Sequence, residues 1–426
     1  DEQGRVAGQR LGDHRALALP AGQLVRVGPE RLGRVGQLDH REQLDRPLGR
    51  LLVRDPVVQP QRLDDLRADR TRRQEYAKMT VLIAGAGIAG ITLALSCHEC
   101  GIDFQIFEQV PELKPLGVGI NVQPHAVREL FEMGLEGRMD ATGVRTRELV
   151  YFSKYGKEIW REPRGVHAGY NWPQFSVHRG KLHMMLLDAM IERCGRGKIF
   201  TGEGVTGFTE RDDGVEVQLA TADGRRRTVR GTVLVGCDGI HSRVRAQLYP
   251  NEGPPKWNGA VMWRGTTEAV PYLTGASIAY AGHAAQKFVT YPISTPDRAT
   301  GKSLINWIAE LRFDPAKGWR REDYNRAGKL EDFLPQFASW NFDWLDIPGL
   351  IRAAEKIYEY PMIDRDPLER WTFGRVTLLG DAAHAMYPIG SNGASQAIID
   401  ARVLAQRFLD QGVGARALES YEAERR

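Results

Sequence analysis

The stretch from Thr80 to Glu108 constrains the fold most, because it carries a nucleotide-binding pattern within one short unit. The apolar run Thr80–Ala84 has the composition of a strand buried on both faces. The glycine-rich turn Gly85–Gly90 follows, then an apolar helical pattern, then a second strand, Asp103–Phe107. This order predicts a β-α-β unit within a parallel sheet covered by helices.

Each part of this unit has a physical role in binding a dinucleotide. Gly85 permits a tight turn, Gly87 lets the backbone approach a pyrophosphate, and Gly90 lets the helix pack closely on the strand. The helix start offers unpaired N–H groups and the positive end of its dipole to phosphate. Glu108, 23 residues after Gly85, is placed to accept hydrogen bonds from ribose hydroxyls. The unit predicts a dinucleotide site without deciding between FAD and NAD.

Two later segments repeat the pattern of a buried strand followed by a polar turn. The segment Thr232–Gly239 ends in an Asp-Gly pair, whose Asp238 caps a helix or contacts a cofactor; taken alone, the cap is favoured. The segment Arg375–Asp381 leads to a glycine-rich loop, Pro388–Ala394, and a long helical pattern. His384 between them is a candidate base, but a structural hydrogen bond is favoured for it. The third segment predicts a second place where backbone N–H groups meet a ligand.

The three motifs, in this order, resemble those of the FAD-dependent aromatic monooxygenases, typified by para-hydroxybenzoate and salicylate hydroxylases. The resemblance covers Met79–Arg426 and is strongest toward the phenazine-modifying branch, the 5-methylphenazine-1-carboxylate monooxygenases. The segments that carry this stronger match are Pro115–Pro124, Glu162–Gly165, Met262–Gly265, Tyr360–Pro367 and Asn392–Gln396.

The resemblance implies an α/β fold with a Rossmann-like FAD-binding domain and an inserted, mainly β substrate domain, as in para-hydroxybenzoate hydroxylase. The FAD-binding domain is predicted over residues 79–255 and 357–426, and the substrate domain over 256–356. Short β-rich segments separated by Gly, Pro and Ser support the insert. Its aromatic side chains form either a pocket for a flat substrate or ordinary core, which is favoured for most of them. They are Trp257, Trp263, Tyr291, Trp307, Trp340 and Trp344.

The resemblance implies FAD bound along its full length, with NADH or NADPH as co-substrate. In one departure from the family, the segment Pro388–Ser395 differs at three positions from the pattern Pro-x-x-Gly-Gln-Gly-x-Asn. Trp263 and Tyr291, together with Tyr387 beside the flavin loop, are predicted to contact the substrate. The predicted cofactor-binding residues are Gly85, Gly87, Ala89, Gly90, Glu108, Gln109, Val118, Gly119, Gln123, Arg179, Val205, Asp238, Gly239, Gly380, Asp381, Pro388, Gly390, Gly393 and Ala394.

The chemistry that this family implies is hydroxylation of an aromatic or heteroaromatic substrate with O2 through a flavin C4a-hydroperoxide. No pair of acidic and basic side chains in the sequence demands a catalytic assignment, so the catalytic residues stay unassigned. Two alternatives remain open at this stage: another flavoenzyme chemistry such as epoxidation or dehydrogenation, and a flavin-binding protein without turnover.

Charge and cysteine content exclude several other classes of protein. The net charge is +4, and residues 1–78 hold 16 basic and 12 acidic side chains, so the rest of the chain is neutral. A neutral body argues against nucleic-acid or membrane-surface binding. Four cysteines in 426 residues indicate a reducing compartment, and we expect a cytoplasmic monomer or homodimer. Cys97 and Cys100 lack a second pair for zinc, and core packing is favoured over a redox role. No metal site is predicted.

Residues 1–78 differ in composition from everything that follows. They contain no Ile, Ser, Asn, Phe, Trp, Cys or Met, and their only aromatic residue is Tyr76. Such a segment has little with which to build a core. We expect a non-native or disordered extension, with Met79 as the natural start. The chain ends at Arg426 inside a helical pattern, so a truncated C-terminus is also expected.

Overall fold

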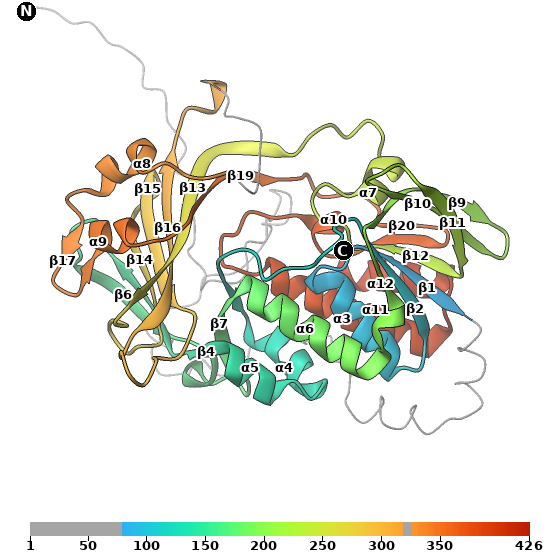
Figure 1. The fold of residues 1–426 in the computed structure, drawn as a ribbon, viewed down its shortest axis with the longest axis horizontal. Helices are drawn as coiled ribbons and strands as arrows, with labels where there is room; N and C mark the ends of the chain where they lie inside the picture. Colours follow the sequence, from blue (N-terminus) through green and yellow to red (C-terminus); the bar gives the residue numbers. More distant parts are fainter. Residues whose placement is uncertain (1–78, 318–325) are drawn as a thin grey trace, which may run out of the picture. The chain divides into compact units, whose positions relative to one another are not determined.

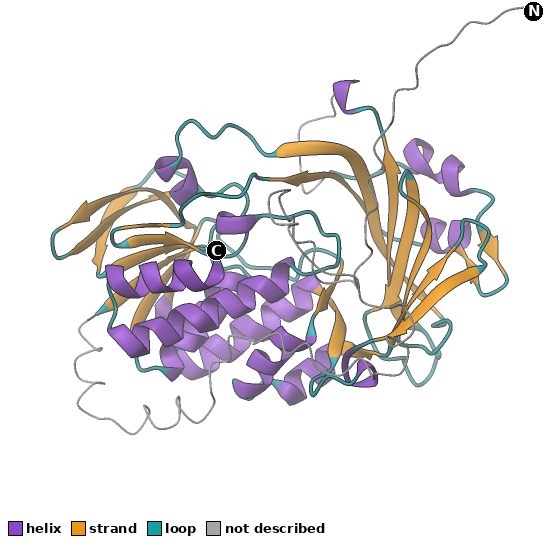
Figure 2. Cartoon of the chain, turned by 180° about the vertical axis from the view of Figure 1, so that it is seen from behind, coloured by secondary structure: helices purple, strands orange, loops and turns teal. Residues whose placement is uncertain are grey.

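A computed structural model describes residues 79–317 and 326–426 (Figure 1). The expectation for residues 1–78 lies outside the described residues. Two large sheets dominate the described part, and Figure 2 shows the long helices grouped against one of them. The α/β architecture predicted from the sequence is confirmed. No helix among the described residues is long and apolar enough to cross a membrane.

The first large sheet has six strands in the order β20-β21-β12-β1-β2-β8. Its neighbours run parallel except for β20, which is antiparallel to β21. Val81, Leu82 and Ile83 of the central strand are fully buried, as the continuous apolar run predicts. The strands are β1 (Thr80–Ala84), β2 (Asp103–Glu108), β8 (Ile199–Thr201), β12 (Val233–Gly236), β20 (Thr372–Phe373) and β21 (Val376–Leu378).

Helices cover one face of this sheet and a small antiparallel sheet covers the other. On the helical face α3 packs against both α6 and α11, as Figure 1 shows. The opposite layer approaches so closely that a Cβ at Gly231 would lie 2.5 Å from Cγ of Leu82. The helices are α3 (Ile88–Glu99), α6 (Arg179–Cys194), α11 (Gly393–Gln411) and α12 (Ala415–Arg425), and the small sheet contains β9 (Glu203–Arg211), β10 (Gly214–Thr221) and β11 (Arg226–Gly231).

The second large sheet has seven strands in the order β19-β13-β16-β15-β14-β5-β6. Its neighbours are antiparallel except for β14 and β5, which run parallel. Three of its strands, β5, β6 and β19, lie outside the range 256–356 expected for the substrate domain. The strands are β5 (Glu148–Phe152), β6 (Glu158–Pro163), β13 (Lys256–Ala269), β14 (Ser277–His283), β15 (Gln286–Pro292), β16 (Ser303–Arg312) and β19 (Ile357–Asp364).

Two short helices, α8 (Leu330–Phe337) and α9 (Ile347–Arg352), pack on one face of the seven-stranded sheet. Side chains alternate between the faces of a strand, and in β13 and β16 this alternation turns Trp263 and Trp307 toward these helices. Trp263 is fully buried and stacks on Phe333 with ring centroids 4.9 Å apart. The tryptophans predicted for this region form ordinary core, and Tyr291 lies on the other face.

Smaller elements join the two large sheets. A three-stranded antiparallel sheet contains β3 (Gly119–Val122), β7 (Gln174–His178) and β4 (Gly143–Thr146). The remaining α-helices are α4 (Pro124–Glu132), α5 (Glu136–Thr142), α7 (Arg243–Leu248) and α10 (Asp381–His384). The hairpin β17 (Asn341–Phe342) and β18 (Leu345–Asp346) and the 3-10 turns Gly165–Ala168, Arg196–Lys198 and Pro315–Lys317 complete the described elements.

Candidate functional site

The three sequence motifs meet at the carboxyl ends of three neighbouring parallel strands. In register, Ala84 of β1 lies opposite Gly236 of β12, which lies opposite Leu378 of β21. A Cβ at Gly85 would lie 2.6 Å from the carbonyl oxygen of Cys237, so the first turn touches the second. Parallel α/β sheets bind ligands at this end of their strands. The sheet therefore brings the three motifs into one site.

The glycines of the first turn fit the roles predicted for them. Gly85 has a φ of +97° and donates its N–H to the carbonyl oxygen of Phe107 at 2.8 Å. A Cβ at Gly90 would lie 2.0 Å from the carbonyl oxygen of Gly85, so the helix approaches the strand too closely for any side chain. A Cβ at Gly87 would meet no atom within 4 Å. The open space at Gly87 gives a cofactor pyrophosphate room to reach the backbone.

Two helix starts flank Gly380, which follows β21. Neither α3 nor α11 has a side-chain cap or an acidic residue in its first turn. A Cβ at Gly380 would lie 3.2 Å from both Ala89 of α3 and Ala397 of α11. Oδ1 of Asn392, just before α11, is buried without a hydrogen-bond partner among the described residues. Uncapped N-termini carry partial positive charge and free donors, which suits an anionic cofactor.

Glu108 lies at the end of β2, as predicted, and it holds the backbone of the first turn. Its carboxylate accepts hydrogen bonds from the N–H groups of Ala86 at 2.8 Å and Val110 at 2.9 Å. His183 of α6 has its Nε2 2.6 Å from the carbonyl oxygen of Ala86. Burial lowers the pKa of His183, which favours the neutral ring. The sequence pattern did not single out His183, since a histidine within a helix carries no local signal.

Two predicted cofactor residues lie on neighbouring segments beside Glu108. A Cβ at Gly204 of β9 would lie 3.0 Å from Cβ of Gln109. Gln109 is exposed, and Val205, the residue after Gly204, is 7% exposed. This neighbourhood is compatible with contacts to the nucleotide end of a cofactor, and these contacts stay a prediction.

Asp238 accepts hydrogen bonds from the start of α7, whose N-cap is Ser242, in agreement with the helix-start role that its sequence context favoured. Its Oδ2 accepts the N–H of Arg243 at 2.7 Å, and its Oδ1 accepts the hydroxyl of Ser242 at 2.5 Å. Gly239 has a φ of +76° and open space beside it. A direct role of Asp238 or Gly239 in cofactor binding stays a prediction.

A buried network fixes the backbone before Asp381. Asp400 is fully buried and its Oδ2 accepts the N–H of Gly380 at 3.1 Å. The same oxygen lies 2.6 Å from Nε2 of His384, and Arg425 donates its Nε to Oδ1 at 2.7 Å. His384 is thus the structural hydrogen-bonding residue that its context favoured. Asp381 keeps an exposed side chain beside this network, and its contact with the cofactor stays a prediction.

The flavin loop predicted at Pro388–Ala394 lies against residues of the β3 region. Gln123 donates its backbone N–H to Oγ of Ser395 at 3.0 Å and its Nε2 to the carbonyl oxygen of Gly390 at 3.2 Å. The backbone N–H of Arg179 donates to the carbonyl oxygen of Val118 at 2.9 Å. The structure therefore brings Gln123, Val118 and Arg179 to the same region as the loop.

Gly119 connects the FAD side of the site to the seven-stranded sheet. Its N–H donates to Oδ1 of Asn306 at 2.7 Å, and its carbonyl oxygen accepts Nη2 of Arg264 at 2.8 Å. Arg264 also hydrogen-bonds Tyr291, and its guanidinium lies over the ring of Tyr360. Asn306 was missed because it belongs to no motif; Arg264 lies within the segment Met262–Gly265 but had no role assigned.

One row of the sheet faces the flavin loop. Successive register partners across β13, β16, β15, β14 and β5 are Arg264, Ile308, Val289, Tyr280 and Tyr151. At about 4.8 Å per strand, Arg264 and Tyr280 are about 14 Å apart along this row. The side chain of Tyr280 hydrogen-bonds Ser391 of the loop, and burial raises the pKa of Tyr280 to about 12. The row combines an apolar centre with phenol groups, as suits a flat aromatic ligand.

Of the predicted substrate residues, two lie on this face and one does not. Burial raises the pKa of Tyr291, which packs with Val289. Tyr387 hydrogen-bonds Asp364, and burial raises the pKa of Tyr387 to about 12. The prediction for Trp263 is corrected, because alternation along β13 places its ring in the core on the opposite face.

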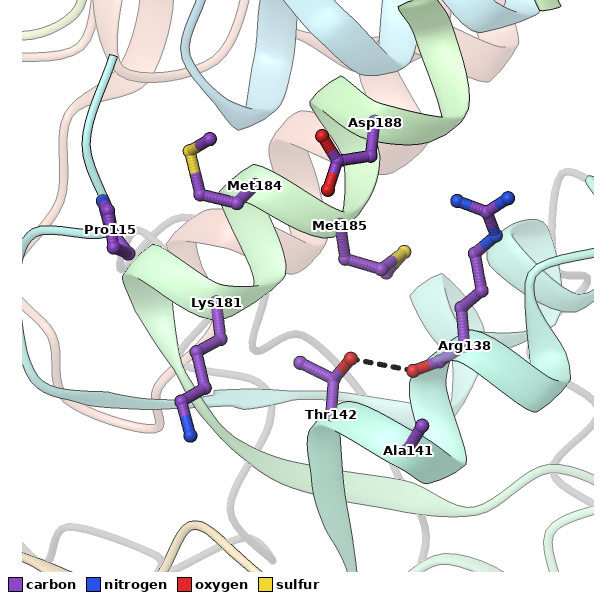
Figure 3. Close-up of a pocket in the computed structure, with 8 residues that line it drawn as sticks. All are labelled: Pro115, Arg138, Ala141, Thr142, Lys181, Met184, Met185 and Asp188. Carbon is purple, nitrogen blue, oxygen red and sulfur yellow. Dashed lines mark hydrogen bonds between the residues drawn. The ribbon is translucent and has the colours of Figure 1, made fainter. Parts of the chain in front are cut away.

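A separate recess lies between α5 and α6 (Figure 3). Its volume is about 480 Å³, and Figure 3 shows Arg138 and Thr142 of α5 across from Met184 and Asp188 of α6. It contains none of the predicted cofactor or substrate residues. The described residues also contain no group of three or more His, Cys, Asp or Glu side chains that could hold a metal ion.

Comparison with known proteins agrees with the geometry. A family model described as an FAD binding domain matches residues 78–426. The chain belongs to this family. Relatives of the chain are named as hydroxylases and monooxygenases of aromatic compounds, so the family and the monooxygenase activity predicted from the motifs are confirmed.

Three similar proteins illustrate the family. A phenazine 1,6-dicarboxylic acid hydroxylase, PhzS, of Lysobacter antibioticus is 46% identical over 351 residues, which cover 81% of this chain and 86% of that protein. A 6-hydroxynicotinate 3-monooxygenase of Bordetella bronchiseptica is 28% identical, covering 82% and 88%. Klebsiella pneumoniae HpxO, whose crystal structure contains FAD and uric acid, is 25% identical in sequence to this chain. The two structures match with a TM-score of 0.68 over 82% of this chain and 85% of HpxO.

Proposed function

We propose that this FAD-dependent aromatic hydroxylase acts on a planar heteroaromatic acid of the phenazine dicarboxylate type, with NADH or NADPH and O2 as co-substrates. The observation that carries the substrate class is the 46% identity, along most of both chains, to a hydroxylase named for phenazine 1,6-dicarboxylic acid. The wide row of phenol and aliphatic side chains between Arg264 and Tyr151 supports a flat ligand of several rings.

The residues of the site fit FAD. The open backbone at Gly87 and the uncapped starts of α3 and α11 would hold the pyrophosphate and the anionic end of the flavin ring. Asp381 would accept hydrogen bonds from the ribityl chain. Bound FAD supplies the two-electron redox chemistry and the activation of oxygen. The protein supplies binding, orientation and exclusion of water.

The seven-stranded sheet would hold the substrate ring against the flavin loop. Ile308 and Val289 provide an apolar floor that excludes water from the ring. Tyr280, with its pKa raised to about 12, stays protonated at neutral pH and keeps a phenol O–H as a donor. We also propose that the substrate domain extends beyond residues 256–356 to include β5, β6 and β19, since these strands complete the sheet.

The test is oxidation of NADH or NADPH by the FAD-loaded protein in the presence of aromatic substrates. Phenazine-1,6-dicarboxylate should stimulate oxidation more than salicylate or 6-hydroxynicotinate and should give a product heavier by one oxygen atom. Tyr280→Phe should retain FAD and lose most of this stimulated rate. Cofactor oxidation that yields only hydrogen peroxide with every substrate would contradict the proposed substrate class.

A further inference from the structure

We propose that Arg164, which directly follows β6, binds a carboxylate of the aromatic substrate. The inference rests on the proposed function and assigns a residue that determines specificity within it. Arg164 lies in the segment Glu162–Gly165, which carries part of the resemblance to the phenazine-modifying branch but has no role in the chemistry described above.

The register of β5 and β6 turns Arg164 toward the substrate face. Glu162 lies opposite Leu149, which belongs to the cluster on that face with Tyr280 and Tyr291. The backbone N–H of Arg164 donates to the carbonyl oxygen of Arg147 at 2.8 Å, which continues the strand pairing by one more step. Alternation then places Glu162 and Arg164 on the substrate face and the residue between them on the other.

The contacts of Arg164 agree with this orientation. Its guanidinium forms an ion pair with Glu162. Burial raises the pKa of Tyr151 and of Tyr280, two phenols of the substrate row. The positive charge of Arg164 opposes this shift at both phenols, so Arg164 lies near them. Because Tyr280 hydrogen-bonds Ser391 of the flavin loop, Arg164 lies at the end of the row that reaches this loop.

Arg164 retains capacity for a further anion. Its side chain is 16% exposed, and its Nε is buried without a hydrogen-bond partner among the described residues. A guanidinium has five N–H donors, and a carboxylate can accept two of them side by side. With Glu162 as its ion-pair partner, Arg164 still has an N–H donor without an acceptor among the described residues. A substrate carboxylate supplies this acceptor.

Two other arginines of this sheet, one at each side of the row, already have partners. Arg264 donates to Gly119 and Tyr291 at the opposite end of the row, and its Nε, like that of Arg164, is buried without a partner among the described residues. Arg161 faces the other side of β6, where it bonds Glu158 and Glu148. Arg161 is therefore a matched control, because it is the same residue type three residues earlier in the chain, turned away from the substrate face.

The experiment measures binding to the FAD-loaded protein by the change in flavin absorbance during titration. The two probes are phenazine-1,6-dicarboxylate and unsubstituted phenazine, which share the ring system and differ in charge. Arg164→Gln should raise the Kd of the dicarboxylate by about tenfold or more, the range expected for a charge-assisted hydrogen bond, and should change the Kd of phenazine less than twofold. Arg161→Gln should change neither Kd more than twofold.

A second variant removes the carboxylate of Glu162, which competes with the substrate for Arg164. Glu162→Gln removes the carboxylate that occupies part of the Arg164 guanidinium, so it should lower the Kd of the dicarboxylate severalfold. This variant keeps the test decisive if Arg164→Gln fails to fold or to retain FAD. Equal weakening of both probes by Arg164→Gln, or weaker acid binding in Glu162→Gln, would overturn the inference.

The result also separates this inference from the proposed function. Wild-type protein that binds the dicarboxylate no more tightly than phenazine refutes a carboxylate site. Wild-type protein that binds the acid selectively through Arg164 but forms no hydroxylated product refutes the proposed substrate turnover and leaves the binding site standing.

Discussion

The contact between Gly119 and Asn306 gives the most direct test of how the seven-stranded sheet is held against β3 of the three-stranded sheet. A Cβ added at Gly119 would lie 2.6 Å from Cβ of Asn306 and 2.8 Å from its Oδ1. The φ of Gly119 lies outside the left-handed region, so Gly119→Ala causes no conformational strain. The cost of the substitution is therefore steric, and it falls on the Asn306 side chain.

The magnitude follows from two contributions. Overpacking a buried position costs about 1–3 kcal/mol. Displacement of Asn306 also breaks its 2.7 Å hydrogen bond from the Gly119 N–H, and a buried unsatisfied donor costs about 1–3 kcal/mol. Gly119→Ala should thus lower the free energy of unfolding by about 2–6 kcal/mol. Asn306→Ala breaks the same hydrogen bond but creates space, and should cost about 1–3 kcal/mol.

The double variant is decisive, because Asn306→Ala removes Cγ and Oδ1 of Asn306, two of the three atoms that the new methyl group would meet, and leaves only Cβ. The hydrogen bond can be lost only once, so the double variant should be less destabilised than the sum of the single ones by at least about 1 kcal/mol. Urea unfolding at saturating FAD measures all four proteins. Gly137→Ala in α5 is the control, since its Cβ meets no atom within 4 Å, and it should stabilise by about 0.5–1 kcal/mol. If the destabilisation of the double variant equals the sum of the two single variants within about 0.5 kcal/mol, the reasoning is refuted.

Three further substitutions or reagents test other parts of the site. Gly90→Ala should reduce FAD affinity more than tenfold, measured by flavin fluorescence, because its Cβ would lie 2.0 Å from a backbone oxygen; unchanged affinity would contradict the close packing of α3. Burial lowers the pKa of His384, but the Asp400 carboxylate raises it further, so the net shift is upward. The contribution of protonated His384 to the free energy of unfolding is complete below about pH 6.5 and is lost as the pH rises through the pKa of His384 in the folded protein. His384→Gln should therefore make the free energy of unfolding less dependent on pH between these two pH values. Burial raises the pKa of Cys97, so a thiol reagent should label Cys194, which is partly exposed, well before Cys97 in the native protein, as mass spectrometry can show.

The sequence was sufficient for the FAD side of the fold because its signals are local. Gly85, Gly87 and Gly90 lie within six residues of one another, and their spacing between a buried strand and a helical pattern predicts the turn, the close helix and the open approach that the structure contains. Parallel strands that are buried on both faces are recognisable in the sequence as continuous runs of apolar residues. The convergence of the three motifs then follows from the rule that parallel strands present their carboxyl ends at one edge.

The substrate side was less predictable because it depends on strand register. The sequence shows that Trp263 and Tyr291 are aromatic residues in strands, but only pairing decides which face each one occupies. Trp263 was predicted to contact the substrate, but pairing places its ring in the core on the opposite face. Tyr280 and Tyr151 were missed, because nothing near them in the sequence shows that they lie side by side on parallel strands.

Two residues missed by sequence reasoning lie far along the chain from Gly119, which they contact. Asn306 reaches Gly119 across 187 residues, and Arg264 reaches it across 145. Both lie on strands of the seven-stranded sheet, as do the phenols that face the flavin loop. Substitutions on these strands alter the substrate surface without touching the glycine motifs that position the cofactor. Specificity can therefore diverge while the FAD site stays fixed, and residues such as Arg164, outside every glycine motif, are where the difference between relatives should be sought.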